Sequence, residues 1–70
     1  MIYGITSDPA TVQVLRLAGI SVKQTSELDQ ALINIPKDAS LIIISAEIAC
    51  ADTINEYREK NPKQMVATIP

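Results

Sequence analysis

The chain lacks several residue types on which enzymes and small secreted domains depend. It contains no His, no Trp and no Phe, and only one Cys among its 70 residues. A single Cys excludes a disulfide framework, and the absence of His excludes Ser-His-Asp and Cys-His triads and the usual zinc sites. With two Tyr as its only aromatic residues, the chain cannot build platforms that stack nucleic-acid bases. We therefore expect a non-catalytic domain with no metal and no cofactor.

Charge and hydropathy further restrict the class of protein to which the chain can belong. Six basic and eight acidic residues leave a formal charge of −2, which is too mild to indicate a nucleic-acid partner. The longest apolar run, residues 41–44, has strand length and falls far short of the roughly 18 to 20 residues of a membrane span. The N-terminus shows no signal-peptide pattern. We expect one cytoplasmic domain, residues 1–70, that buries only about 60% of its unfolded surface.

Two kinds of pattern alternate along the chain. Residues 1–6 and 40–45 are apolar on both faces, which is typical of buried parallel strands. Residues 20–24 alternate apolar and polar side chains, as an edge strand does, and a final strand is predicted over 65–69. The segments between these strands show helical spacing of apolar residues, with helices predicted to end at about residues 18, 35 and 60.

Local signals mark the helix ends. Asp8 can cap the first helix, Pro9 suits its first position, and Gly19 suits the left-handed residue that follows it. Ser26 stands three residues before an Asp and resembles a weak capping box for the second helix. Asp52 is predicted to cap the third helix.

The resulting order, β-α-β-α-β-α-β, predicts an α/β fold. We expect a four-stranded parallel sheet in the order 2-1-3-4, with a Rossmann-like or flavodoxin-like arrangement of three layers. Because crossover connections are right-handed, the second and third helices should share one face and the first helix should stand alone on the other. Parallel sheets need both faces covered, so one face is predicted to be under-covered over the third and fourth strands. We expect another chain to cover it.

The first helix carries more apolar surface than its own sheet requires. At about 100° per residue, only Gln13 and Arg16 form a clear polar sector, and the apolar arc spans about 220°. Val14, Arg16 and Leu17 are therefore candidate partner-binding residues. The alternative for Val14 and Leu17 is the ordinary exposure of scattered apolar side chains, and for Arg16 a solvated charge rather than a pair with a partner's acid.

Two polar positions follow predicted strands. Asp8 could hold a metal, as acidic residues do in response-regulator receivers, but its counterparts here are Ser7 and Ser45 rather than further acids. Ser45 with Glu47 could suggest a nucleophile and a base, yet no activating His exists. Helix capping or another structural role is the favoured interpretation for Asp8, Gly19 and Ser45. The lone Cys50 has apolar neighbours and is expected in the core.

Three segments resemble the F subunit of the A/V-type rotary ATPases (V-type ATPases and ATP synthases). Residues 7–19 end in Leu-Arg-Leu-Ala-Gly, residues 41–49 form an aliphatic strand followed by Ser-Ala-Glu, and residues 65–70 close the chain on Ile-Pro. The sequence departs from the family pattern at Val14, where Gly is usual. The resemblance implies the N-terminal domain of such a protein, with the family's C-terminal helical segment outside residues 1–70.

The resemblance implies a non-catalytic component of the central stalk. Such a component binds the coiled-coil D subunit of the rotor, here called the coiled-coil rotor subunit, and the catalytic head of the ATPase. It helps couple ATP hydrolysis or synthesis to ion transport, carries no active site and stays peripheral to the membrane. Two alternatives remain open on the sequence: a small receiver- or flavodoxin-like regulatory or ligand-binding module, and a domain that covers its own bare face with a second copy.

Overall fold

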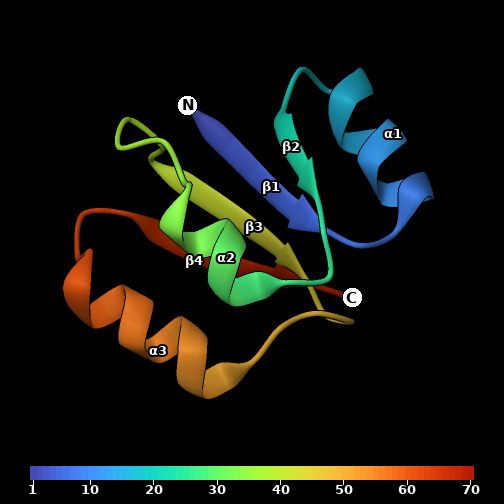
Figure 1. Cartoon of the computed structure of the whole chain (residues 1–70). Coiled ribbons are helices and arrows are strands. Elements are labelled where there is room, and N and C mark those ends of the chain that lie inside the picture. The colour runs from blue at the N-terminus through green and yellow to red at the C-terminus, as the bar shows by residue number, and fades with distance from the viewer.

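The computed structural model describes residues 1–70 as four strands and three helices in strict alternation (Figure 1). The elements, in chain order, are β1 (Ile2–Thr6), α1 (Pro9–Leu17), β2 (Ser21–Gln24), α2 (Leu28–Ile33), β3 (Leu41–Ser45), α3 (Ala51–Lys60) and β4 (Met65–Ile69). The four predicted strands are confirmed to within one residue at each end.

All strand pairs are parallel, and the sheet order is β2-β1-β3-β4. The predicted fold class and strand order are therefore confirmed. The two runs that are apolar on both faces, β1 and β3, lie at the centre, and the alternating β2 lies at an edge. Their register aligns Ile5 with Ile44 and Ile43 with Ala67.

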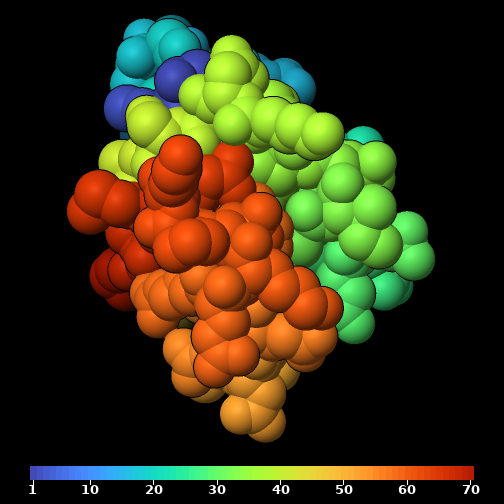
Figure 2. All heavy atoms as spheres, turned by 90° about the vertical axis from the view of Figure 1, so that its left-hand side faces the viewer, coloured from blue at the N-terminus to red at the C-terminus, as the bar shows by residue number.

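The core lies between the sheet and the layer formed by α2 and α3. Figure 1 shows these two helices on the near side of the sheet, with α1 apart from them beyond β2. Figure 2 shows α2 and α3 packed side by side, with β4 reaching the surface next to α3. The buried cluster in this layer comprises Ile5, Leu28, Ala31, Leu32, Ala39, Ile42, Ile44 and Ile54.

The ends of α1 are as the sequence predicts. The carboxylate of Asp8 accepts hydrogen bonds from the backbone N–H groups of Ala10 (3.4 Å) and Thr11 (3.3 Å) and from the Thr11 hydroxyl (2.8 Å). Pro9 occupies the first helical turn, where its missing N–H leaves no bond unmade. Gly19 has φ of +80°, a conformation that side chains with a Cβ rarely adopt.

Two other predicted caps are wrong. The N-cap of α2 is Glu27 rather than Ser26, and its side chain makes no capping hydrogen bond. The Glu27 N–H donates to the Thr25 hydroxyl at 3.0 Å. Helix α3 begins before Asp52, because the Ile54 N–H already bonds to the carbonyl oxygen of Cys50 at 2.9 Å. Asp52 therefore lies inside the first turn, where its carboxylate still faces the positive end of the helix dipole.

The expectation that Cys50 is a core residue is also wrong. Cys50 is exposed at the N-cap of α3, whereas the preceding Ile48 and Ala49 pack against the core. Hydrogen bonding by the side chain and then the backbone N–H of Thr53 lowers the pKa of the Cys50 thiol. The apolar neighbours that suggested burial make the core contacts, and Cys50 itself makes none.

The Asp8 cap gives the fold a component of acid sensitivity. The Thr11 hydroxyl is the main cause that lowers the pKa of this carboxyl below 3.8, the N–H groups of Ala10 and Thr11 add to it, and desolvation opposes it. Because the folded pKa lies below the unfolded value, this contribution is complete above about pH 5, declines as the pH falls through the unfolded pKa, and is lost as it falls through the folded pKa. Asp8→Asn keeps a cap acceptor but cannot titrate.

We expect the thermal midpoint of the unmodified chain to fall more steeply between about pH 5 and pH 2 than that of Asp8→Asn. Circular dichroism melts at matched ionic strength measure both slopes. Parallel slopes would show that the cap contributes nothing that depends on ionisation of Asp8.

Candidate interaction surface

The sheet has an apolar face that no helix of the chain fully covers. The side chains of Ile5, Ile42, Ile44 and Val66 pack in the layer of α2 and α3. Since successive side chains of a strand point to opposite faces, their neighbours point to the other side. On this other side, the apolar residues at the alternate positions of β1, β3 and β4 form what we call the apolar strip; they are Ile2, Leu41, Ile43, Met65, Ala67 and Ile69. Met65 is 70% exposed and Ile2 is 40% exposed.

Helix α1 covers only the other half of this face. It packs on β2 and β1, with Val12 and Leu15 buried against the sheet. Gly4 permits this approach, because a Cβ at Gly4 would lie 2.9 Å from the Leu15 Cδ1 atom. The part of the strip on β3 and β4 therefore lies beside α1 rather than beneath it, and the predicted under-covered face is confirmed.

The buried pair Val12 and Leu15 fixes how α1 is rotated on the sheet. At about 100° per residue, the direction opposite to this pair falls between Ala10 and Leu17. Leu17 is 89% exposed, the largest value among the exposed large hydrophobic residues of the chain. A leucine that points directly away from its own sheet gains nothing from that sheet, so its apolar area is available to a second molecule.

The two flanks of α1 differ in chemistry. The right-handed crossover from β1 to β2 turns the flank that carries Val14 and Ala18 toward β3 and the strip. Gln13 and Arg16 lie on the opposite flank, above the outer side of β2. Val14 is 64% exposed. We call the exposed apolar residues of this helix the α1 ridge; they are Ala10, Val14, Leu17 and Ala18.

The structure separates the three predicted partner-binding residues. Val14, Arg16 and Leu17 are all exposed on α1. Val14 and Leu17 belong to the α1 ridge, whereas Arg16 lines a shallow hollow with Gln13 and Leu17 on the far flank. Arg16 therefore does not border the apolar strip. The six strip residues were not singled out individually from the sequence, although the predicted alternation of each strand identifies them once the helices are assigned to their faces.

The uncovered region has the dimensions of one helix. Neighbouring strands lie about 4.8 Å apart, so β3 and β4 together offer a width of about 10 Å, and five residues extend about 17 Å. A helix with its side chains is about 10 to 12 Å across. We call this uncovered region, from the α1 ridge to the outer edge of β4, the recess; one helix of about 11 residues would cover it.

The carboxyl edge of the sheet is closed by a hydroxyl network. The Ser45 hydroxyl donates to the Thr6 hydroxyl oxygen at 2.7 Å, and this oxygen also accepts from the Asp8 N–H at 3.1 Å. The Thr6 hydroxyl in turn donates to a carboxylate oxygen of Glu47 at 3.3 Å. Thr6 and Ser45 are buried, and their bonds join β1 to β3 and to the loops that follow.

Ser45 is thus structural, but it caps no helix, because α3 starts six residues further along the chain. Sequence pattern alone does not identify Thr6 as a member of this network. The aligned pair Ile5 and Ile44 places Thr6 beside Ser45 once the register is known. No group of three or more His, Cys, Asp or Glu side chains is placed to hold a metal ion.

A second hollow lies between the C-terminal parts of α2 and α3, with Leu32, Ile35 and Tyr57 among its lining residues. Burial raises the pKa of Tyr57, whose hydroxyl donates to Gln64. The Gln64 amide donates to the carbonyl oxygens of Pro36 (3.2 Å) and Ala39 (3.0 Å). These bonds hold β4 and α3 against the loop before β3.

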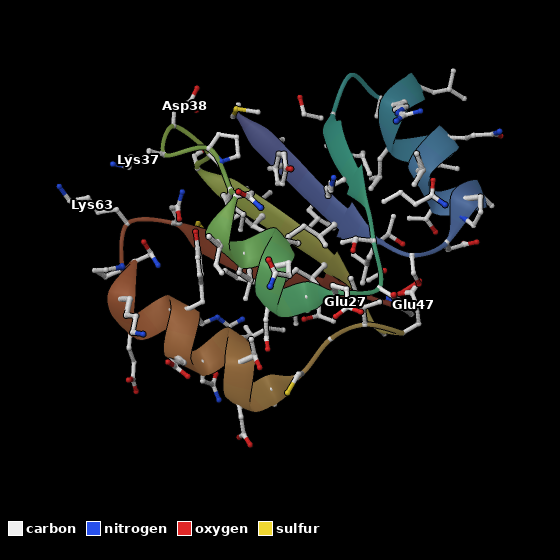
Figure 3. The ribbon with its side chains drawn as sticks, viewed as in Figure 1. Glu27, Lys37, Asp38, Glu47 and Lys63 are labelled. Atoms are coloured by element: carbon white, nitrogen blue, oxygen red, sulfur yellow. The ribbon has the colours of Figure 1, made fainter.

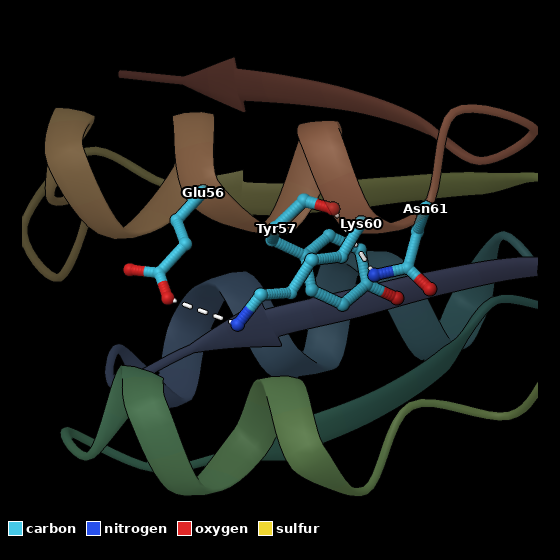
Figure 4. A network of polar contacts seen from close by, with 4 residues as sticks. All are labelled: Glu56, Tyr57, Lys60 and Asn61. Atoms are coloured by element: carbon cyan, nitrogen blue, oxygen red, sulfur yellow. Dashed lines mark hydrogen bonds and ion pairs between the residues drawn. The ribbon is translucent and has the colours of Figure 1, made fainter.

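The rim of this second hollow is polar and locally paired. Figure 4 shows the ion pair between Lys60 and Glu56, at 3.0 Å, and the bond from the Asn61 amide to the Tyr57 carbonyl oxygen, also at 3.0 Å. Both interactions lie within the last turns of α3 and stabilise the end of that helix.

No family model matches the chain, and no curated protein or solved structure matches it. None of the three helices has the length and apolar character needed to cross a membrane.

The close approach of α1 to β1 predicts a steric effect at Gly4. Gly4→Ala should lower the free energy of unfolding by about 1 kcal/mol, because the new Cβ displaces the far end of the buried Leu15 side chain, which can shift. Leu15→Ala alone should cost about 2 to 5 kcal/mol through lost burial. In the double variant the added methyl group meets no Leu15, so the two losses should be less than additive. Urea denaturation of the four proteins measures this coupling, and strict additivity would contradict the contact.

Proposed function

We propose that this chain is a non-catalytic component of the central stalk of an A/V-type rotary ATPase, similar to the F subunit. In this role it binds the coiled-coil rotor subunit and lies next to the catalytic head, peripheral to the membrane on the cytoplasmic side. It transmits torque through a protein interface and contributes no residue to ATP hydrolysis.

The observation that carries the proposal is an apolar sheet face that α1 covers only over β1 and β2, so that a region with the ideal width of one helix stays uncovered over β3 and β4. The α1 ridge forms one wall of the recess and the apolar strip forms its floor. A helix of a coiled coil presents an apolar stripe of suitable length to such a groove. No position of β3 or β4 that points to this face carries a charge, in a chain with 14 charged residues.

A second observation connects this surface with the resemblance seen in the sequence. The three segments similar to the stalk family are residues 7–19, 41–49 and 65–70. They contain α1, β3 and β4, which are the elements that form the ridge and nearly all of the strip. The segments outside these three, residues 1–6, 20–40 and 50–64, contain β1, β2, α2 and α3. This coincidence supports a shared binding function for the resembling segments.

The test is affinity co-purification of the full chain with the coiled-coil rotor subunit encoded by the same genome. We expect a stable complex, and we expect Leu17→Glu to weaken it at least about tenfold because a charge would enter an apolar contact. Ile33→Glu is the matched control, since Ile33 is 76% exposed but lies on α2, across the sheet from the recess. The control should bind within about twofold of the unmodified chain.

Absence of a complex between the unmodified proteins would refute the stalk assignment. Thermal-shift measurements with nucleotides, flavins and divalent cations address the alternative of a receiver- or flavodoxin-like module. Clear stabilisation by one of these ligands would favour that alternative over the stalk assignment.

A further inference from the structure

The face that carries α1 has a shape complementary to itself. The α1 ridge rises by the thickness of one helix above β1 and β2, and the recess beside it has the width of one helix above β3 and β4. A ridge and a recess of equal size on one face can be matched by a second copy of the same face. This property does not depend on the identity of any other partner.

We propose that two copies of this chain associate through this face, each placing its α1 ridge in the recess of the other. The two-fold axis runs parallel to the strands. Rotation about it exchanges the two halves of the face, so each ridge meets the opposite recess. A two-fold axis across the strands would place α1 against α1 and leave both recesses empty. The symmetric contact is closed, as in most homodimers.

The orientation of the side chains on α1 fits this arrangement. Leu17 and Ala10 point directly away from their own sheet, and in the dimer they rest on the apolar strip of the second copy. Leu17, 89% exposed in the single chain, becomes the central anchor of each half of the interface. Met65, 70% exposed on the strip, is the flexible side chain best able to adapt to it.

The flank of α1 that faces the recess carries small side chains, which suit the close packing of two helices about the dimer axis. Thr11, Val14 and Ala18 lie on this flank, and a two-fold axis parallel to the helix brings each of them opposite its own counterpart. Their small side chains permit the two helices to approach to about 8 to 10 Å. Gln13 and Arg16 occupy the other flank and stay in water at the rim. The polar sector of α1 thus falls where the dimer leaves the helix exposed.

The face that carries α1 is large enough for a specific dimer interface. A specific interface buries about 800 Å² on each partner. The whole chain exposes 4503 Å² over a body of 30 × 23 × 19 Å, so about one sixth of its surface must be covered. One complete face of the body supplies this share. Four of the six exposed large hydrophobic residues, Ile2, Val14, Leu17 and Met65, lie on the face in question.

The inference goes beyond the proposed function and does not rest on it. The recess that would receive a helix of the coiled-coil rotor subunit receives α1 of the second copy when no other helix is bound. The two occupants exclude one another, so the dimer is the form of the isolated chain, and binding of the rotor helix would release monomers.

Sedimentation equilibrium of the full chain tests the association. We expect a mass of about twice 7.6 kDa for the unmodified protein. Leu17→Glu should raise the dimer dissociation constant at least about tenfold, whereas Ile33→Glu on the opposite layer should leave it within about twofold. A monomer at millimolar concentration would overturn the proposal. A dimer that Leu17→Glu leaves intact would overturn it as well, because pairing would then use another surface such as the β4 edge.

A cysteine pair tests the geometry. In a Cys50→Ser background, Val14→Cys should form a disulfide between the two copies under mild oxidation, because position 14 faces its own counterpart across the axis. Gln13→Cys, on the outer flank of the same helix, is the matched control and should stay largely monomeric on non-reducing gels. Circular dichroism establishes that both variants are folded. Equal cross-linking at both positions, or cross-linking at position 13 alone, would overturn the two-fold arrangement.

Failure of this inference is distinguishable from failure of the proposed function. A monomeric chain that binds the coiled-coil rotor subunit would refute only the dimer. A dimeric chain that does not bind it would refute only the stalk assignment.

Discussion

The handedness of the strand connections is the constraint on which the rest of the structure depends. Since β-α-β crossovers are right-handed, the step from β1 out to β2 puts α1 on one face, and the two steps in the opposite direction put α2 and α3 on the other. Two helices are enough for one face of a four-stranded sheet, and one helix is not. The uncovered recess is therefore a consequence of topology, and no single substitution within a helix would remove it.

The same topology also determines where acidic and basic side chains are favourable. Parallel strands with returning helices bring all helix N-termini to the carboxyl edge of the sheet and all C-termini to the amino edge. Acidic side chains stabilise the first kind of end and basic side chains the second. Figure 3 shows Glu27 and Glu47 toward one end of the molecule, and Lys37 and Lys63 toward the other, beside Asp38. Of the five labelled side chains, the two Glu and the two Lys follow this rule and Asp38 does not, and the apolar strip beside α1 carries no charge.

Strand positions and sheet order could be predicted from the sequence because the spacing of apolar residues and the residue composition both indicate which strands are buried on two faces. Residues 40–45 are an example. The caps of α2 and α3 could not. Ser26 and Asp52 are good cap residues, but a helix starts where its first backbone bond closes, and tertiary packing of Leu28 and Ile54 sets that point. The predicted helix through Ile35 likewise ends at Ile33, although Ile35 still packs on the core.

The candidate surface could be located from the sequence only in part. The sequence does not show how α1 is rotated about its own axis on the sheet. Spacing shows that α1 is apolar over about 220° but does not show which part of the arc meets the sheet. The structure supplies the angle, because Val12 and Leu15 are buried, and Gly4 leaves the space in which the Leu15 side chain approaches β1. Once Leu15 is inside, Leu17 must point outward and Val14 must face the recess. The packing of two residues on the sheet thereby determines which residues of α1 are left for a partner, and a glycine on the strand beneath leaves room for one of the two.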